Sequence, residues 1–156
     1  MSRQYRVAVV GATGAVGEVM LAVLAERKFP ISEIYALASE RSAGGYVPVE
    51  AIIGSLAKVG NDEVMVRDLA SFDPTGIDIA LFSAGGSISK QYAPKFAAAG
   101  AVVIDNSSVF RGDADVPVVV SEVNPEQIRN RPRGIIANPN CSTMQLMVAL
   151  APIHRE

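Results

Sequence analysis

Cys141 is the only cysteine of this 156-residue chain and its first candidate for covalent chemistry. It follows Asn138-Pro139-Asn140 and precedes apolar residues at helical spacing, so we expect it at the start of a helix. A helix N-terminus favours the thiolate, which attacks carbonyl carbons, and backbone amides there can stabilise an oxyanion. The alternative is a buried structural cysteine, the commoner fate of a free thiol. The only histidine, His154, lies roughly 20 Å along the same expected helix and cannot be the base for this thiol.

Three glycines form a second candidate site, between the first apolar run and the first helical pattern. Gly11, Gly14 and Gly17 give the spacing G-x-x-G-x-x-G, which differs by one position from the usual dinucleotide-binding fingerprint. Glycines there permit a tight turn and a close approach of the backbone to a pyrophosphate, whose charge a helix N-terminus favours. We therefore predict a dinucleotide site. The alternative is a tight strand-to-helix turn that binds no ligand.

The residues after the second expected strand bear on the choice between NAD and NADP. An acidic residue at this position binds a ribose 2′-hydroxyl, whereas arginine and serine hold a 2′-phosphate. The sequence offers both, Glu40 and the pair Arg41-Ser42. Because a carboxylate aimed at a phosphate would be repelled, one of the two must point away. The residue types by themselves favour NADP only slightly.

Arg111 is the remaining candidate for ligand binding. It follows the polar run from Asp105 to Ser108, after an expected parallel strand, so it can reach the ligand crevice at the carboxyl ends of the strands. Its planar guanidinium suits a phosphate or a carboxylate. The alternative is a surface arginine paired with Asp113 or Asp115.

The elements that must position these residues alternate between strands and helices. Short apolar runs predict strands at residues 5–10, 34–38, 77–82, 101–104, 117–120 and 134–137. Apolar residues at three- and four-residue steps predict helices at residues 16–28, 88–99 and 142–154. Pro94 is expected to break the second helix, Gly100 to cap it, and Pro152 to bend or end the third.

Residues 46–70 suggest short antiparallel strands, with a pairing that Gly54 and Gly60 leave open. Elsewhere, strands that alternate with helices predict parallel βαβ units. The fold class is therefore α/β: a doubly wound, mostly parallel sheet of the NAD(P)-binding Rossmann type.

Composition and charge restrict the class of protein. Apolar residues make up 49% and charged residues 19% of the chain, which is enough apolar material for the core of one domain. The net charge of -2 argues against nucleic acid or an anionic membrane as a partner. No apolar run approaches the roughly 18 residues of a bilayer span, and no secretory signal is recognisable, so we expect a cytoplasmic protein. A single cysteine excludes an internal disulfide, and we expect no metal site.

Several segments together resemble the aspartate-semialdehyde dehydrogenase family. They are residues 11–17, 37–44, 82–87, 101–111, 118–124 and 138–143, the last reading Asn-Pro-Asn-Cys-Ser-Thr. The cysteine segment and the Arg-Ser pair are specific to the family, whereas the glycine loop alone is not.

The resemblance implies an NADP-dependent oxidoreductase. The family interconverts L-aspartyl 4-phosphate and L-aspartate 4-semialdehyde through a cysteine thioester, with inorganic phosphate, in lysine, methionine and threonine biosynthesis. By match to its motifs, Cys141 is the nucleophile, Asn140 shapes the active site and Arg111 holds the phosphate group. The resemblance makes the preference for NADP firm. The expected cofactor residues are Gly11, Thr13, Gly14, Ala15, Val16, Gly17, Ser39, Arg41, Ser42, Ser83 and Gly85.

The resemblance also implies that residues 1–156 are an NAD(P)-binding domain ending just after the catalytic cysteine. Family members carry a second domain for substrate binding and dimerisation, with the catalytic base and the substrate-orienting Gln and Arg. We expect that domain to be absent here, this chain alone to be inactive, and the full-length protein to be a homodimer or homotetramer. Departures from the family pattern are residues 46–62, Gly112 and Ser121.

Three alternatives stay open. The first is an enzyme like N-acetyl-gamma-glutamyl-phosphate reductase, which shares the fold and the thioester chemistry. The second is a nucleotide-binding module without activity. The third is an α/β domain that no longer binds a cofactor and serves as an interaction partner.

Overall fold

The computed structural model describes residues 3–48 and 63–155. Its strands are β1 (Tyr5–Val10), β2 (Ile31–Ala38), β3 (Tyr46–Pro48), β4 (Glu63–Asp68), β5 (Ile79–Phe82), β6 (Val102–Asp105) and β7 (Ile135–Ala137). Its helices are α1 (Ala15–Glu26), α3 (Gly86–Ala98) and α4 (Cys141–Arg155), with short 3-10 helices η1 (Glu40–Ser42) and η2 (Pro125–Arg129). Most expected elements are present, with ends shifted by a few residues.

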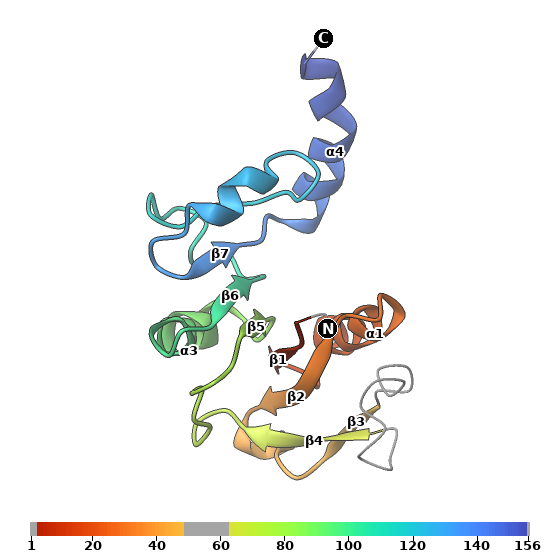
Figure 1. The fold of residues 1–156 in the computed structure, drawn as a ribbon, viewed down its shortest axis with the longest axis vertical. Helices are drawn as coiled ribbons and strands as arrows, with labels where there is room; N and C mark the ends of the chain where they lie inside the picture. Colours follow the sequence, from red (N-terminus) through yellow and green to blue (C-terminus); the bar gives the residue numbers. More distant parts are fainter. Residues whose placement is uncertain (1–2, 49–62, 156) are drawn as a thin grey trace.

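The described strands form one sheet in the order β3-β4-β2-β1-β5-β6-β7. All neighbouring pairs are parallel except β3 and β4, which are antiparallel. Helices α1 and α3 lie on opposite sides of the sheet (Figure 1). This confirms the doubly wound, mostly parallel fold. The antiparallel pairing expected within residues 46–70 holds for β3 with β4, while the part of that expectation on residues 49–62 lies outside the described residues.

The core has two layers, one on each face of the sheet, and β1 contributes to both. Val7 and Val9 pack with Leu21 of α1 on one face. Val10 packs with Phe96 of α3 on the other. All five side chains are at most 1% exposed, and burial of each contributes about 1.5–3 kcal/mol. A strand buried on both faces needs apolar residues at every position, which is why the sequence of β1 reads as a continuous run.

Pro94 does not break the second helix, contrary to the expectation. Helix α3 runs through it from Gly86 to Ala98. Proline removes the hydrogen bond to the carbonyl four residues earlier, that of Lys90. Both residues are exposed, so water can solvate that carbonyl, while buried Phe96 holds the helix on the sheet. Gly100, at φ +99, ends the helix as expected.

The strand expected at residues 117–120 is also wrong. Only an isolated bridge joins Val118 to Ala137 of β7. The Asn124 side chain accepts a hydrogen bond from the Val120 amide at 2.8 Å and donates one to the Val118 carbonyl at 3.0 Å. This asparagine satisfies backbone groups that a neighbouring strand would otherwise pair with. No helix in the described residues is long and apolar enough to cross a membrane.

Candidate active site

The candidate residues lie at one edge of the sheet, at the carboxyl ends of the parallel strands. The chain runs from β1 outward to β2 on one side, and β5 and β6 lie on the other side of β1. The strand order therefore reverses between β1 and β5. Ligands of doubly wound sheets bind in the crevice at such a switch point.

Two of the three loop glycines are required by close contacts within the protein. Gly11 has φ +86, and a Cβ on it would lie 2.6 Å from the carbonyl oxygen of Ser83. A Cβ on Gly17 would lie 2.1 Å from the Gly11 carbonyl oxygen, so α1 packs directly on the loop. By contrast, a Cβ on Gly14 would meet only the Gly11 oxygen, at 3.4 Å. The protein itself therefore leaves room at Gly14, as a backbone that approaches a ligand requires.

The start of α1 can bind an anion. Gly14 is its N-cap residue and offers no side-chain hydrogen bond to the first turn. The first amide groups of a helix have no acceptor within it, and the helix dipole adds positive potential there. Thr13, Ala15 and Val16 are exposed around these amides. This arrangement fits a pyrophosphate.

A cleft of about 490 Å³ opens beside this loop, at the ends of β1, β2, β4 and β5. The expected cofactor residues that line it are Gly11, Thr13, Gly14, Ser39 and Ser83. Those that do not line it are Ala15, Val16, Gly17, Arg41, Ser42 and Gly85. Leu69, Ile88 and Tyr92 give the cleft apolar surface that suits a flat ring system.

Of the two residue types that follow β2, the acidic one faces the cleft. Glu40 lines it, whereas Arg41 and Ser42 continue along η1 outside the lining. Arg41 is exposed and Ser42 half-buried. Sequence reasoning also missed the lining segment 68–70 after β4, because residues 46–70 read as antiparallel strands and only β3 with β4 pairs that way.

Cys141 is the first residue of α4, as expected, and it is exposed. Asn140 caps this helix: its Oδ1 accepts hydrogen bonds from the Ser142 amide at 3.0 Å and from the Ser142 hydroxyl at 2.5 Å. The Cys141 thiol lies 4.0 Å from the same oxygen. Exposure excludes the buried structural cysteine that was the alternative. His154 lies near the far end of α4, away from the thiol.

Arg111 is fixed by two carbonyl oxygens that follow neighbouring strands. Its Nε donates to Asn138 at 2.8 Å and its Nη2 donates to Asn106 at 3.2 Å. The Asn138 side chain in turn donates to the Asn106 side-chain oxygen at 2.8 Å. The guanidinium, which is half-buried, is thus tied to the segment that leads into Cys141.

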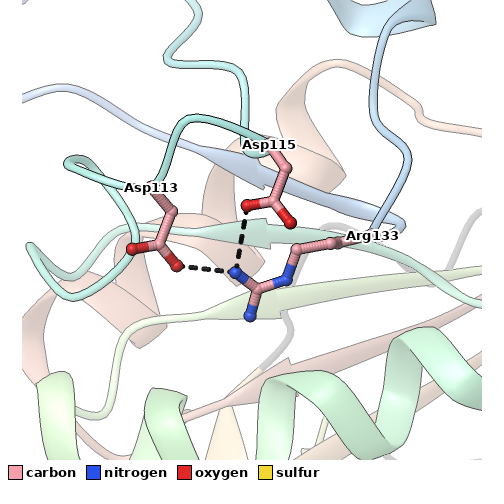
Figure 2. A network of polar contacts seen from close by, with 3 residues as sticks. All are labelled: Asp113, Asp115 and Arg133. Carbon is pink, nitrogen blue, oxygen red and sulfur yellow. Dashed lines mark hydrogen bonds and ion pairs between the residues drawn. The ribbon is translucent and has the colours of Figure 1, made fainter.

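The acidic residues that were the alternative partners of Arg111 pair with another arginine. Figure 2 shows Asp113 and Asp115 converging on Arg133, at 2.6 and 3.3 Å. The hydrogen bond that Arg133 donates to Asp113 raises the pKa of Arg133 above its usual value. Within residues 3–48 and 63–155, no carboxylate forms an ion pair with Arg111. Its charge is therefore available to an anionic ligand.

The thiol and the cleft lie along the same edge of the sheet. Cys141 follows β7, and β7 is separated from β5 by β6 alone. Neighbouring strands are about 4.8 Å apart, so these two strand ends are about 10 Å apart. Gly14 follows β1, one strand beyond β5, so an extended dinucleotide with its pyrophosphate at Gly14 has to bridge three strand spacings, about 14 Å, to reach Cys141.

The comparisons with known proteins agree with this geometry. Residues 6–131 match the family described as semialdehyde dehydrogenase, NAD binding domain. Aspartate-semialdehyde dehydrogenase 2 of Vibrio cholerae is 54% identical over 155 residues, which cover 99% of this chain and 43% of that protein. The chain thus spans less than half the length of this relative.

Solved structures give the same result. Aspartate semialdehyde dehydrogenase II from Vibrio cholerae, complexed with ASA, matches 98% of this chain and 47% of its own, with a TM-score of 0.86 and 52% identity. Aspartate semialdehyde dehydrogenase with NADP from Candida albicans matches 97% of this chain and 47% of its own, with a TM-score of 0.74 and 26% identity.

Proposed function

Since the chain belongs to the semialdehyde dehydrogenase family, we propose that it is the cofactor-binding part of an NADP-dependent aspartate-semialdehyde dehydrogenase. The reaction is the reductive dephosphorylation of L-aspartyl 4-phosphate to L-aspartate 4-semialdehyde, a step towards lysine, methionine and threonine. One observation carries the proposal: an exposed thiol at a helix N-terminus shares a sheet edge with a glycine-lined cleft.

In this mechanism Cys141 is the nucleophile. Its thiolate attacks the acyl carbon of the aspartyl phosphate, the carbon–oxygen bond to phosphate breaks, and a thioester to Cys141 forms. Amides in the first turn of α4 stabilise the oxyanion of the tetrahedral adduct. Asn140 supports this by holding that turn in place through its cap to Ser142. The reduced cofactor, NADPH, would supply the hydride to the thioester carbon when bound. The bond from that carbon to the Cys141 sulfur then breaks, which releases the aldehyde and restores the thiolate.

Arg111 holds the phosphate group that leaves. Its Nε and Nη2 are engaged with backbone carbonyls, which fixes the plane of the guanidinium. A fixed guanidinium orients two oxygens of a phosphate better than a mobile ammonium would. Inorganic phosphate is accordingly the second product and a ligand of this chain.

The cofactor loop runs over Gly11, Thr13 and Gly14, with the pyrophosphate at the start of α1. Support for NADP comes from the Candida albicans relative, whose structure was solved with it. The 2′-phosphate then lies at Arg41 and Ser42, and Glu40 must turn out of the cleft for it to bind.

The remaining groups of the reaction belong to a second domain. Because the Vibrio cholerae relative is more than twice as long as the matched part, we place the catalytic base and the substrate-orienting residues there. Exposed apolar side chains on α1 and α4, such as Val19 at 59% and Ile153 at 71%, support burial against further protein. We propose a homodimer or homotetramer for the full-length protein.

The test is calorimetric binding of NADP and NAD to this chain. Tight, NADP-selective binding is expected, with Arg41→Ala losing at least tenfold in NADP affinity and little in NAD affinity. The control is Arg129→Ala, an exposed arginine on η2. Glu40→Gln should strengthen NADP binding, since it removes a negative charge from the cleft. Equal losses for both cofactors in Arg41→Ala would exclude the 2′-phosphate role, and no binding to either would contradict the cofactor site.

A further inference from the structure

Asp105, the last residue of β6, is a fully buried acidic side chain that the proposed mechanism does not use. Its Oδ1 accepts a hydrogen bond from the Ser89 hydroxyl at 2.5 Å, and its Oδ2 accepts one from the Ser107 hydroxyl at 2.5 Å. Ser89 is also fully buried. Burial of a carboxyl group is costly even when it is hydrogen-bonded, and apolar residues would fill such a place at lower cost. Its presence therefore calls for a role beyond packing.

The first of the two serines, Ser89, is connected to the turn that lies beside the cofactor cleft. Ser89 lies in the first turn of α3, and its amide donates to the Gly85 carbonyl at 3.0 Å. Gly85 is the residue with φ +88 that turns the chain from β5 into α3. Ser83, which lines the cleft, lies just before this turn.

The second serine, Ser107, lies in the turn that leads to Arg111, the proposed phosphate-binding residue. The Ser107 oxygen accepts a hydrogen bond from the Val109 amide at 3.3 Å, and the Ser108 carbonyl accepts one from the Arg111 amide at 3.3 Å. Ser107 thus orders the turn that presents Arg111. The backbone carbonyl of Asp105 also accepts from the Asn138 amide at 2.7 Å, and Asn138 is the residue to which Arg111 donates.

From these contacts we infer that Asp105 is a positioning residue. Its two carboxyl oxygens hold the first turn of α3 against the turn of residues 106–111, which fixes the spacing between the cleft-lining segment 83–84 and Arg111. This inference rests on the proposed function, because it assigns the purpose of these hydrogen bonds to the cofactor and phosphate sites.

The experiment removes each of the two hydrogen bonds to the Asp105 side chain separately and leaves Asp105 itself unchanged. Ser107→Ala removes the hydroxyl on the phosphate side, Ser107→Thr keeps a hydroxyl, and Ser108→Ala removes an exposed hydroxyl of the same turn. Ser89→Ala removes the hydrogen bond between the start of α3 and Asp105, next to the cofactor cleft. Each variant of this chain is measured for hydrogen exchange of the Arg111 Nε–H by nitrogen-15 NMR, for affinity to inorganic phosphate, for affinity to NADP, and for thermal unfolding.

We expect two opposite patterns. Ser107→Ala should speed exchange of the Arg111 Nε–H and weaken phosphate binding about tenfold each, as loss of one hydrogen bond implies, with NADP affinity nearly unchanged. Ser107→Thr and Ser108→Ala should behave like the unaltered chain. Ser89→Ala should weaken NADP about tenfold and leave the Arg111 Nε–H exchange unchanged.

A purely structural role gives a different result. Both alanine variants would then unfold at lower temperature while exchange and both affinities stayed at the values of the unaltered chain, and the inference would be overturned. If the unaltered chain bound neither NADP nor phosphate, the proposed function would fail. The Arg111 Nε–H exchange of Ser107→Ala would still decide whether Asp105 positions that arginine.

Discussion

The three loop glycines should respond to alanine in three different ways. A Cβ on Gly17 would overlap backbone atoms at 2.1, 2.7 and 2.8 Å, and none of them can rotate away. Overpacking of this kind costs about 1–3 kcal/mol, and backbone overlap places Gly17→Ala at the upper end. Gly11→Ala meets backbone at 2.6 Å and also forces a side chain into φ +86, which adds about 1–2 kcal/mol.

Gly14→Ala is the informative member of the set. Gly14 has φ -90, and its nearest non-neighbouring atom would lie 3.4 Å from the added Cβ, so the folded chain accepts alanine within about 0.5 kcal/mol. A bound pyrophosphate does not accept it, because the methyl group occupies the space that the phosphate oxygens need. We expect NADP affinity to fall by at least about tenfold, or 1.4 kcal/mol, with stability unchanged.

Urea unfolding followed by circular dichroism measures the first effect, and calorimetry with NADP measures the second. The reasoning fails if Gly17→Ala is as stable as the unaltered chain, since α1 would then not rest on the Gly11 carbonyl. It also fails if Gly14→Ala binds NADP as well as the unaltered chain does. In that case the pyrophosphate would lie elsewhere.

Three further outcomes are expected. Cys141 should react with iodoacetamide faster than free cysteine at neutral pH, because it is exposed at the start of α4; a slower rate would contradict activation by the helix. Asn140→Ala should destabilise α4 by about 1 kcal/mol through loss of the cap to Ser142, measured by thermal unfolding, with Asn140→Asp as the variant that keeps it. The hydrogen bond from Tyr35 lowers the pKa of Glu33 below its usual 4.5. The stabilisation that this hydrogen bond gives the folded chain is therefore complete above that pH and lost on acidification. On acidification Glu33→Gln should lose less stability than the unaltered chain does. The difference should be under about 1 kcal/mol, because Glu33 is partly exposed.

The parts of the fold that could be predicted are those fixed by local pattern. A strand buried on both faces, such as β1, must be apolar throughout, and Gly11 must be glycine because of its φ. The errors involve side-chain contacts and packing that hydrophobic periodicity does not encode. Asn124 binds the backbone at Val118 and Val120, and no periodicity in residues 117–120 reveals this. Pro94 is tolerated because its face of α3 is exposed, which depends on how the helix docks.

The candidate site follows the same division. The positions of Cys141 and of the glycine loop follow from local order along the chain, so they could be predicted. The partners of Asp113 and Asp115 could not, because Arg133 reaches them from about 20 residues away and competes with the nearer Arg111. Likewise, Asp105 reads as one member of a polar run, and only the packing of α3 over β6 buries it.

The central place of β1 has a consequence for synthesis on the ribosome. Val10 is paired with Leu37 on one side but with Phe82 on the other, about 70 residues later in the chain. At about 5–20 residues per second, the backbone N–H and C=O groups along one edge of β1 stay unpaired for several seconds after the strand has emerged. Ser83, which closes the cleft against Gly11, emerges only after β5. Both the pairing of β1 and the closure of the cofactor cleft therefore wait for β5, so the cofactor cannot protect that edge of β1 during synthesis.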